Sequence, residues 1–379
     1  MRVLLLTNIY PTSGVPNAAT FIRSRLDALV AHGVEVVPVA LRPTWTPTAQ
    51  VLRRLAGRQV EDPPSEPFRE ATAPLGPAHA RRRRLETRSG GRWLDAVTGS
   101  VLASVTGPVD VVHAHGMYDL PAGLVAQAVA GRLGVPYVVT MHGTDVNLLM
   151  PRRTGLYGRV LAGACATVYV STALKDRAHS LVPPHPRAHV VPNGVDLSLF
   201  RPSPRAAAPT VLYVGNLEHV KGADRLPAIW RGVQDALPEA RLTVVGAGTL
   251  EGALHRELTG PTVRFLGRLD QTEVARQMGE AHVLVLPSRA EGGPTVMMEA
   301  YAAGTPVVGT AVGGIPETVV DPWCVVPNGP DVEGALARAV VRVLRSEEDS
   351  RDRLVDVARP FSWRSVGARE LAIYRGCGS

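Results

Sequence analysis

Two glutamates flank a glycine–proline turn in the stretch 287–304, PSRAEGGPTVMMEAYAAG. Glu291 precedes Gly-Gly-Pro at residues 292–294, and Glu299 stands inside the helical pattern that follows. Pro294 suits the first helical position, because the N–H that proline lacks would have no partner there. The free amides and positive dipole end of a helix N-terminus bind phosphate, whereas carboxylates hold hydroxyl groups. The stretch predicts a ligand carrying both, such as a nucleotide sugar; the alternative is an ordinary strand–loop–helix unit with two solvated glutamates.

The strands predicted around it would place the stretch 287–304 at the edge of a parallel sheet. The preceding run 281–286, AHVLVL, is short, apolar and β-branched, as expected for a buried parallel strand. Near the N-terminus, residues 2–6 and 34–40 predict strands, separated by apolar residues at helical spacing that end at Gly33. A strand, a helix and a strand at this spacing form a parallel βαβ unit, whose ligands bind beyond the carboxyl ends of the strands. The sequence therefore predicts an α/β fold.

The length of 379 residues fits two domains of ordinary size. Pro202-Ser203-Pro204 and the residues that follow read as a linker, and the strand pattern restarts at Thr210. We expect an N-terminal domain over residues 1–200, a second domain over 205–360 and a terminal helix over 361–379.

Three histidines and an aspartate follow two predicted strands of the first domain. His113 and His115 end the strand 110–115, while His142 and Asp145 follow the strand 136–141. Because adjacent parallel strands end at one edge of a sheet, these side chains would lie on the ligand side. A metal site is the alternative, but no further ligands at a suitable spacing accompany them, so no metal is expected.

Residues 42–92 interrupt the strand–helix pattern. Prolines at positions 63, 64, 67, 74 and 77 exclude a long helix, and the segment holds eleven arginines against five acidic residues. The run Arg81–Arg84 suggests an arm that binds anionic lipid head groups or an anionic acceptor, and the alternative is a solvated insertion. Nucleic acid is not an expected partner, because aromatic residues for base stacking are not interleaved with these arginines.

The composition of the chain indicates the cellular compartment in which we expect it. No internal apolar run reaches the roughly 20 residues that cross a bilayer, and the opening MRVLLLTNIYP is too short for a signal peptide. Cys165, Cys324 and Cys377 are odd in number and far apart, so no disulfide framework is predicted and a reducing cytoplasm is expected. The sequence has two lysines, Lys175 and Lys221, among its 41 basic residues.

Several ordered motifs resemble those of retaining GT-B glycosyltransferases of family 4. Their Glu-x7-Glu signature is matched by Glu291 and Glu299, followed by AAGTPVVGT and GGIPE. Further matches are HAHG at 113–116, TMHGTD at 140–145, VPNGVD at 191–196 and YVGNLEHVKG at 213–222, so the resemblance covers nearly the whole chain. It implies two Rossmann-like domains facing a cleft, with a terminal helix that crosses back to the first domain.

For the second domain, the resemblance implies a donor site. The family holds the diphosphate with an arginine and a lysine; this sequence keeps Lys221 but has Asn216 in place of the arginine. Glu299 is expected to hold the ribose and Glu291 a sugar hydroxyl. The expected donor-binding set also includes Gly246 under the nucleotide, Arg268 and Leu269 at the base, and Gly292, Gly293, Pro294 and Thr295 at the helix start.

For the first domain, the resemblance implies contacts with sugar and acceptor. His142 matches the family histidine near the donor sugar, which makes His142, Lys221 and Glu291 the expected catalytic residues. His113, His115 and Asp145 are expected on the acceptor side. Gly14, in the loop after the first strand, is a further donor-site candidate.

The expected reaction moves a hexosyl unit from a nucleoside diphosphate sugar, UDP-linked by family precedent, to an alcohol with retention. The sequence lacks Asp-x-Asp, so neither a metal nor another cofactor is expected, and the acceptor is a glycan, a lipid-linked glycan or a natural-product aglycone such as an aminocyclitol. Three alternatives stay open: a nicotinamide-dependent oxidoreductase using Gly246–Gly252, a glycosidase using two carboxylates, and an inactive binding protein. We expect a cytoplasmic protein, peripheral to the inner face of the membrane if Arg81–Arg84 bind lipid.

Overall fold

The computed structural model describes residues 1–12, 19–45, 48, 51, 64–75, 92–118, 120–346 and 350–378. The chain divides into two compact units, Met1–Pro192 with Val366–Ser379, and Asn193–Ser365. The first unit thus ends at Pro192, earlier than the linker expected near residue 205, and the C-terminal segment belongs to it.

The first unit is built on a parallel sheet of seven strands in the order β3-β2-β1-β4-β5-β6-β7. Its strands are β1 (Arg2–Thr7), β2 (Glu35–Trp45), β3 (Arg69–Leu75), β4 (Val111–His115), β5 (Tyr137–Met141), β6 (Ala166–Tyr169) and β7 (Ala188–Val190). Its helices are α1 (Thr20–Val30), α4 (Arg92–Ser104), α5 (Ala122–Leu133), η1 (Asp145–Leu149), η2 (Met150–Arg152), α6 (Thr154–Ala162), α7 (Thr172–His179) and α15 (Trp363–Cys377).

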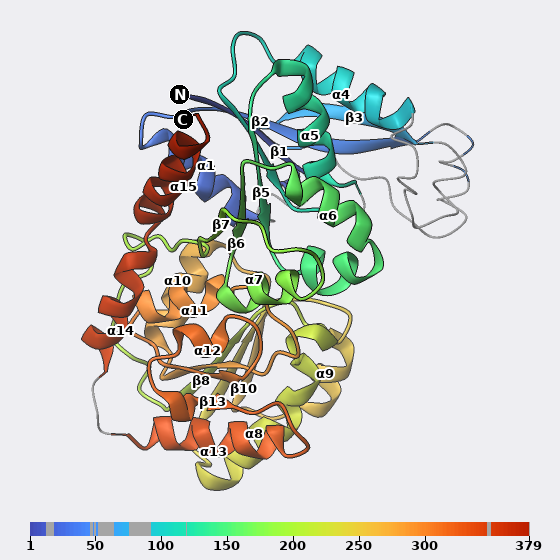
Figure 1. The fold of residues 1–379 in the computed structure, drawn as a ribbon. Coiled ribbons are helices and arrows are strands. Elements are labelled where there is room, and N and C mark those ends of the chain that lie inside the picture. Colours follow the sequence, from blue (N-terminus) through green and yellow to red (C-terminus); the bar gives the residue numbers. More distant parts are fainter. Residues whose placement is uncertain are drawn as a thin grey trace. The chain divides into compact units, whose positions relative to one another are not determined.

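Helices cover both faces of this sheet, as the predicted α/β fold requires (Figure 1). One face packs a large apolar core against α4, α5 and α6, with Val97, Val125 and Val160 fully buried. On the opposite face, Leu5 and Ala40 pack against Ile22 and Leu26 of α1. Alternate residues of each strand point to opposite faces, which is why the strand runs are apolar throughout.

Strand β3 lies within the segment 42–92, which the sequence analysis described only as an interruption of the strand–helix pattern. It pairs in parallel with β2, from Val39 opposite Arg69 to Trp45 opposite Leu75. Within its sequence, REATAPL, Ala71 and Ala73 are fully buried, and Thr72 between them is partly exposed. Small alanines give a weak apolar signal, so the period of two was missed. Arg81–Arg84 lie outside the described residues.

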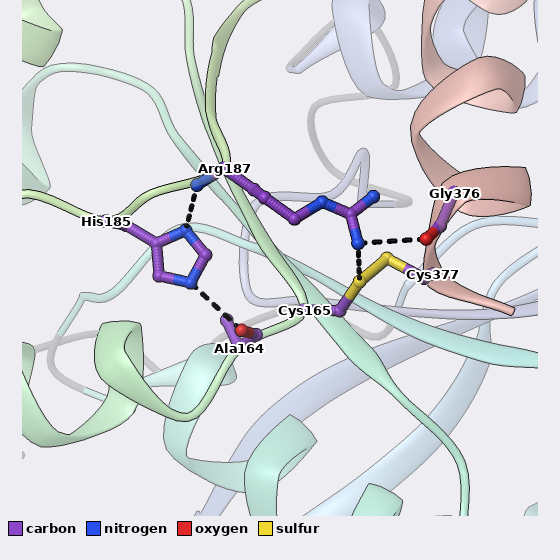
Figure 2. The surroundings of a disulfide bond; sticks show 6 residues. All are labelled: Ala164, Cys165, His185, Arg187, Gly376 and Cys377. Carbon is purple, nitrogen blue, oxygen red and sulfur yellow. Dashed lines mark hydrogen bonds between the residues drawn. A yellow bond between two sulfur atoms is a disulfide. The ribbon is translucent and has the colours of Figure 1, made fainter. Parts of the chain in front are cut away.

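A disulfide corrects the prediction from the cysteines. Cys165, just before β6, is bonded to Cys377 at the end of α15, a sequence separation of 212 residues. Figure 2 shows Arg187 beside it, donating from Nη1 to Cys165 Sγ at 3.2 Å and to the Gly376 carbonyl at 2.9 Å. Cys324 is the buried free cysteine. The argument from unpaired cysteines to a reducing compartment is therefore wrong.

The second unit is built on a parallel sheet of six strands in the order β10-β9-β8-β11-β12-β13. Its strands are β8 (Thr210–Val214), β9 (Arg241–Val245), β10 (Val263–Gly267), β11 (Val283–Leu286), β12 (Val307–Thr310) and β13 (Val325–Val326). Its helices are η3 (His219–Lys221), η4 (Ala223–Arg225), α8 (Leu226–Ala236), α9 (Glu251–Glu257), α10 (Gln271–Glu280), α11 (Thr295–Ala302), α12 (Ile315–Thr318), η5 (Pro322–Cys324), α13 (Val332–Leu344), α14 (Arg351–Ala358) and η6 (Arg359–Phe361).

In each sheet the order in which strands are added reverses once, and this position indicates where ligands bind. The strand order reverses between β1 and β4 in the first unit and between β8 and β11 in the second. In open parallel sheets, ligands bind outside the carboxyl ends of the strands at this switch point. The loops after β8 and β11, and the ends of β4 and β5, are therefore the segments where a ligand is expected to bind.

Candidate active site

Lys221 and Glu291 meet at the switch point of the second unit. Lys221 closes the loop after β8, and Glu291 lies in the loop after β11. The Lys221 Nζ donates to both carboxylate oxygens of Glu291, at 2.9 and 2.8 Å, and Ser288 Oγ donates to Oε1 at 2.7 Å. The Glu291 side chain is 6% exposed and that of Lys221 is 36% exposed. The Glu291 carboxylate is thus nearly buried, whereas the Lys221 side chain that it binds is partly open to solvent.

Close backbone contacts fix the loops that carry this pair. Gly222 has a positive φ of 68°, and a Cβ there would lie 1.9 Å from the Pro287 carbonyl oxygen. A Cβ at Gly246 would lie 1.9 Å from the Gly215 carbonyl oxygen. Both contacts exclude any side chain, because real Cβ atoms do not approach backbone so closely. Gly246 therefore packs the loop after β9 against the loop after β8.

Helix α11 begins immediately after the glycine loop, but one residue later than predicted. Thr295 is its first residue, and Pro294 is the N-cap in an extended conformation, φ −71° and ψ 104°. Among the described residues no side chain caps the helix, and the Met297 amide donates to the Pro294 carbonyl at 3.1 Å, so the amides of Thr295 and Val296 keep their donor capacity. The Thr295 hydroxyl accepts a hydrogen bond from Asn193 Nδ2 at 3.2 Å. Gly292, Gly293 and Pro294 are partly accessible.

Glu299 lies in α11 and is half-buried, and within the described residues its carboxylate has no hydrogen-bond or ion-pair partner. Desolvation raises the pKa of Glu299 to about 7. A carboxylate desolvated without a cation or donor is costly to keep ionised. Such a group is poised to accept hydrogen bonds from a ligand.

The other predicted donor residues lie on the same edge of the sheet. Asn216 is exposed in the loop after β8, and its carbonyl accepts a hydrogen bond from the Tyr213 hydroxyl at 2.9 Å. Arg268 is exposed directly after β10, and Leu269 packs at the margin of the apolar core. Ser288 was missed by the sequence analysis, although its place three residues before Glu291 in the same loop was a usable signal.

The histidines of the first unit form one connected cluster. His113 and His115 alternate on β4 and share a face of the sheet, with ring centroids 4.1 Å apart. His115 Nδ1 and His142 Nε2 are 3.1 Å apart and share a hydrogen bond. His113 Nε2 bonds Thr140 Oγ1 at 2.7 Å, and its Nδ1 bonds the Tyr374 hydroxyl at 2.6 Å. His142 Nδ1 and His115 Nε2 are buried and have no hydrogen-bond partner in the part of the chain that the structure describes.

Burial keeps this cluster uncharged. Desolvation, reinforced by the positive charge of Arg25, lowers the pKa of His142 to about 3 and lowers those of His113 and His115 well below 6.5. Arg25 is itself fully buried and pairs with Glu370 of α15. At neutral pH the histidines therefore act as neutral hydrogen-bonding groups.

The burial of His113, His115 and Asp145 speaks against direct contact with an acceptor, because none of the three exposes any surface. Asp145 instead accepts backbone N–H bonds from His142, Gly143 and Val146. Its carboxylate thus shapes the turn that presents His142. Burial raises the pKa of Asp145 against the effect of these hydrogen bonds.

Sequence reasoning missed Arg25, Tyr374 and Glu370 as members of this network. Arg25 lies three residues after Ile22 on the apolar face of its helix, and such an isolated charge was a usable signal. Gly14 lies outside the described residues. In the described part of the chain, no group of three His, Cys, Asp or Glu side chains could hold a metal ion, and no helix is long and apolar enough to cross a bilayer.

Two family models match this chain. The model for glycosyl transferases group 1 matches residues 208–346, and the model for glycosyltransferase family 4 matches residues 18–199.

Curated relatives and a solved structure agree with these models. The chain is 32% identical over 325 residues to D-inositol 3-phosphate glycosyltransferase 1 of Catenulispora acidiphila, covering 75% of this chain and 76% of that protein. It is 31% identical over 290 residues to glycogen synthase of Mycobacterium tuberculosis, covering 70% and 68%. Its fold is similar to that of Anabaena HepE in complex with UDP, with a TM-score of 0.69, 16% identity and coverage of 98% and 99%.

These findings favour sugar transfer over the alternatives that the sequence left open. The glycines of the rival dinucleotide motif serve backbone packing, since a Cβ at Gly248 would lie 2.5 Å from the Leu217 carbonyl oxygen and Gly252 lies within α9. The two parallel sheets agree with the GT-B fold, and the family models and the relatives are those of glycosyltransferases. The chain belongs to glycosyltransferase family 4 and is a nucleotide-sugar-dependent glycosyltransferase of the GT-B fold.

Proposed function

We propose that this enzyme transfers a hexosyl unit from a UDP-linked sugar to an alcohol, with retention and without a metal. The observation that carries the proposal is the Lys221–Glu291 pair at the switch point of the second sheet, in the loop that leads into α11. In the reaction, the bond from the anomeric carbon to the diphosphate breaks and a bond to the acceptor oxygen forms on the same face. The acceptor proton passes to the departing diphosphate.

Lys221 and the first amides of α11 are proposed to bind the diphosphate. Their positive ends would stabilise the charge that grows on the leaving group, which is the largest demand of this chemistry. Glu291 holds the lysine in place through both carboxylate oxygens. A carboxylate has about four acceptor sites, so Glu291 retains capacity for a sugar hydroxyl.

Glu299 is proposed to bind the ribose. It carries two acceptor oxygens, is partly desolvated and has no hydrogen-bond or ion-pair partner within the described residues. The loop with Arg268 and Leu269 is assigned to the base. UDP is favoured as the nucleotide because HepE, a protein of similar fold, binds UDP.

His142 is proposed to contact the donor sugar, because it is the one histidine of the cluster that is partly exposed. A neutral imidazole can hydrogen-bond a hydroxyl group without competing for the negative diphosphate. For the acceptor, relatives named for glycogen synthesis and for transfer to D-inositol 3-phosphate support a hydroxyl group on a glycan or a cyclitol.

A thermal-shift panel of UDP, GDP, ADP and NAD tests the nucleotide. A ligand at about 100 times its Kd adds roughly 2.7 kcal/mol to stability, enough to raise Tm by a few degrees. UDP should raise the Tm of the wild type, and raise it less in Glu299→Gln. A Tm that responds to NAD alone, or to none of the diphosphates, would contradict the proposal.

A further inference from the structure

The last helix of the chain is fastened to the first unit at several points. Arg25 of α1 pairs with Glu370 of α15, with both side chains fully buried. A Cβ at Gly367 would lie 2.8 Å from the Ala28 carbonyl oxygen, so α15 and α1 are in close contact there. Figure 1 shows the two helices side by side.

The end of α15 is tied down separately. The disulfide joins Cys377 to Cys165, and Arg187 donates to the Gly376 carbonyl (Figure 2). His185 braces Arg187 by accepting its backbone N–H at Nδ1, 3.1 Å away, and by bonding the Ala164 carbonyl through Nε2. Tyr374 lies between the two anchors, so its hydroxyl is held in a defined position.

Tyr374 reaches the histidine cluster from this fixed helix. Its side chain is 1% exposed, and its hydroxyl is 2.6 Å from His113 Nδ1. Each ring nitrogen of His113 has a hydroxyl partner, the Tyr374 phenol at Nδ1 and Thr140 Oγ1 at Nε2, so the ring is held from both sides. The ring of His113 packs on His115, and His115 in turn bonds His142. A continuous row of contacts thus runs from α15 to His142.

We infer that Tyr374 is a positioning residue: through His113 and His115 it fixes the ring of His142, the residue proposed to contact the donor sugar. This inference rests on the proposed function, because it takes His142 as the group that contacts sugar. It makes the C-terminal helix part of the sugar-binding apparatus of the first unit. The hydroxyl of Tyr374 would act without touching any substrate.

The test compares Tyr374→Phe with Tyr137→Phe in the full-length chain. Tyr137 is a matched control, because its buried hydroxyl also donates within the first unit, to the Val160 carbonyl at 2.6 Å, but does not touch the histidines. Loss of either hydroxyl should lower Tm. Tyr374→Phe alone should lower kcat by about 3- to 10-fold with little change in the KM for donor.

A second readout needs no turnover. In ¹⁵N-histidine NMR spectra, Tyr374→Phe should shift the ring nitrogens of His113, His115 and His142, while Tyr137→Phe should leave them unchanged. Combining Tyr374→Phe with His113→Asn should add little to the kcat loss of His113→Asn, because the hydroxyl acts through that ring.

The outcomes separate the two proposals. If the wild type transfers sugar and both Phe variants match in kcat and leave the His142 signals unchanged, the positioning role is refuted and the proposed function stands. If the wild type transfers sugar from no nucleotide donor, the proposed function fails. The NMR shifts then decide whether Tyr374 sets the His142 ring.

Discussion

Replacing Glu299 with glutamine should change stability and donor affinity in opposite directions. The pKa of Glu299 rises from its ordinary 4.5 to about 7, because burial disfavours the charged form. That difference corresponds to roughly 3 kcal/mol between the two protonation states. The folded chain holds the proton more tightly than the unfolded chain. Protonation of Glu299 therefore contributes its full stabilisation of the folded chain below pH 4.5, and this stabilisation is lost as the pH rises to about 7.

Glu299→Gln removes this titration and keeps the side-chain shape. At pH 8 the variant should be more stable than the wild type by up to about 3 kcal/mol, and at pH 5 the difference should shrink towards zero. Urea denaturation at the two pH values measures the effect. Glu257→Gln, at an exposed position in α9, removes the same charge without desolvation and should show no such pH dependence.

Donor binding should respond in the other direction. The amide has one acceptor oxygen where the carboxylate has two, and it lacks the charge that strengthens bonds to the ribose hydroxyls. We expect a loss of about 1.5–3 kcal/mol in the binding free energy of UDP. UDP would then bind roughly 10- to 150-fold more weakly, which calorimetry can measure. If the variant is destabilised at pH 8 and still binds UDP like the wild type, Glu299 is neither a desolvated carboxyl nor a ribose ligand.

Four further outcomes are expected. Lys221→Ala should lower kcat roughly 100-fold and weaken UDP binding, because the interaction grows as the diphosphate leaves; an unchanged kcat in saturation kinetics would remove the lysine from that role. Asn216→Arg should tighten UDP binding by calorimetry, since it adds a cation to the loop that carries Lys221. Transfer should survive EDTA, and an activity lost to the chelator and restored by Mn²⁺ would contradict the metal-free site. Cys377→Ser should destabilise the chain by roughly 2–4 kcal/mol in denaturation under non-reducing conditions, and a wild type insensitive to dithiothreitol would argue against the disulfide.

The basic segment gives an additional test. Replacing Arg81–Arg84 with serine should abolish binding to liposomes that contain anionic lipid and leave transfer to a soluble acceptor intact. Liposome binding that persists in the variant would assign no membrane role to these arginines.

Local patterns were enough for most of the fold. The strands predicted at 110–115 and 136–141 match β4 and β5 to within one residue, because buried parallel strands are continuous apolar runs. Strand β3 was not predicted, because its buried residues are alanines, which give only a weak hydrophobic pattern. Pro294 was placed one residue too far into α11, since proline tolerates both the N-cap and the first helical position.

The sequence by itself determined the family, the two parallel sheets and the residue types of the donor site. Tertiary structure alone decided which of these residues touch. Lys221 and Glu291 are 70 positions apart and meet because β8 and β11 are neighbours at the switch point. Arg25 and Glu370, 345 positions apart, and the disulfide across 212 positions depend on the return of α15 to the first unit. Such contacts leave no periodic trace in the chain, because side chains brought together by folding need no fixed spacing in sequence.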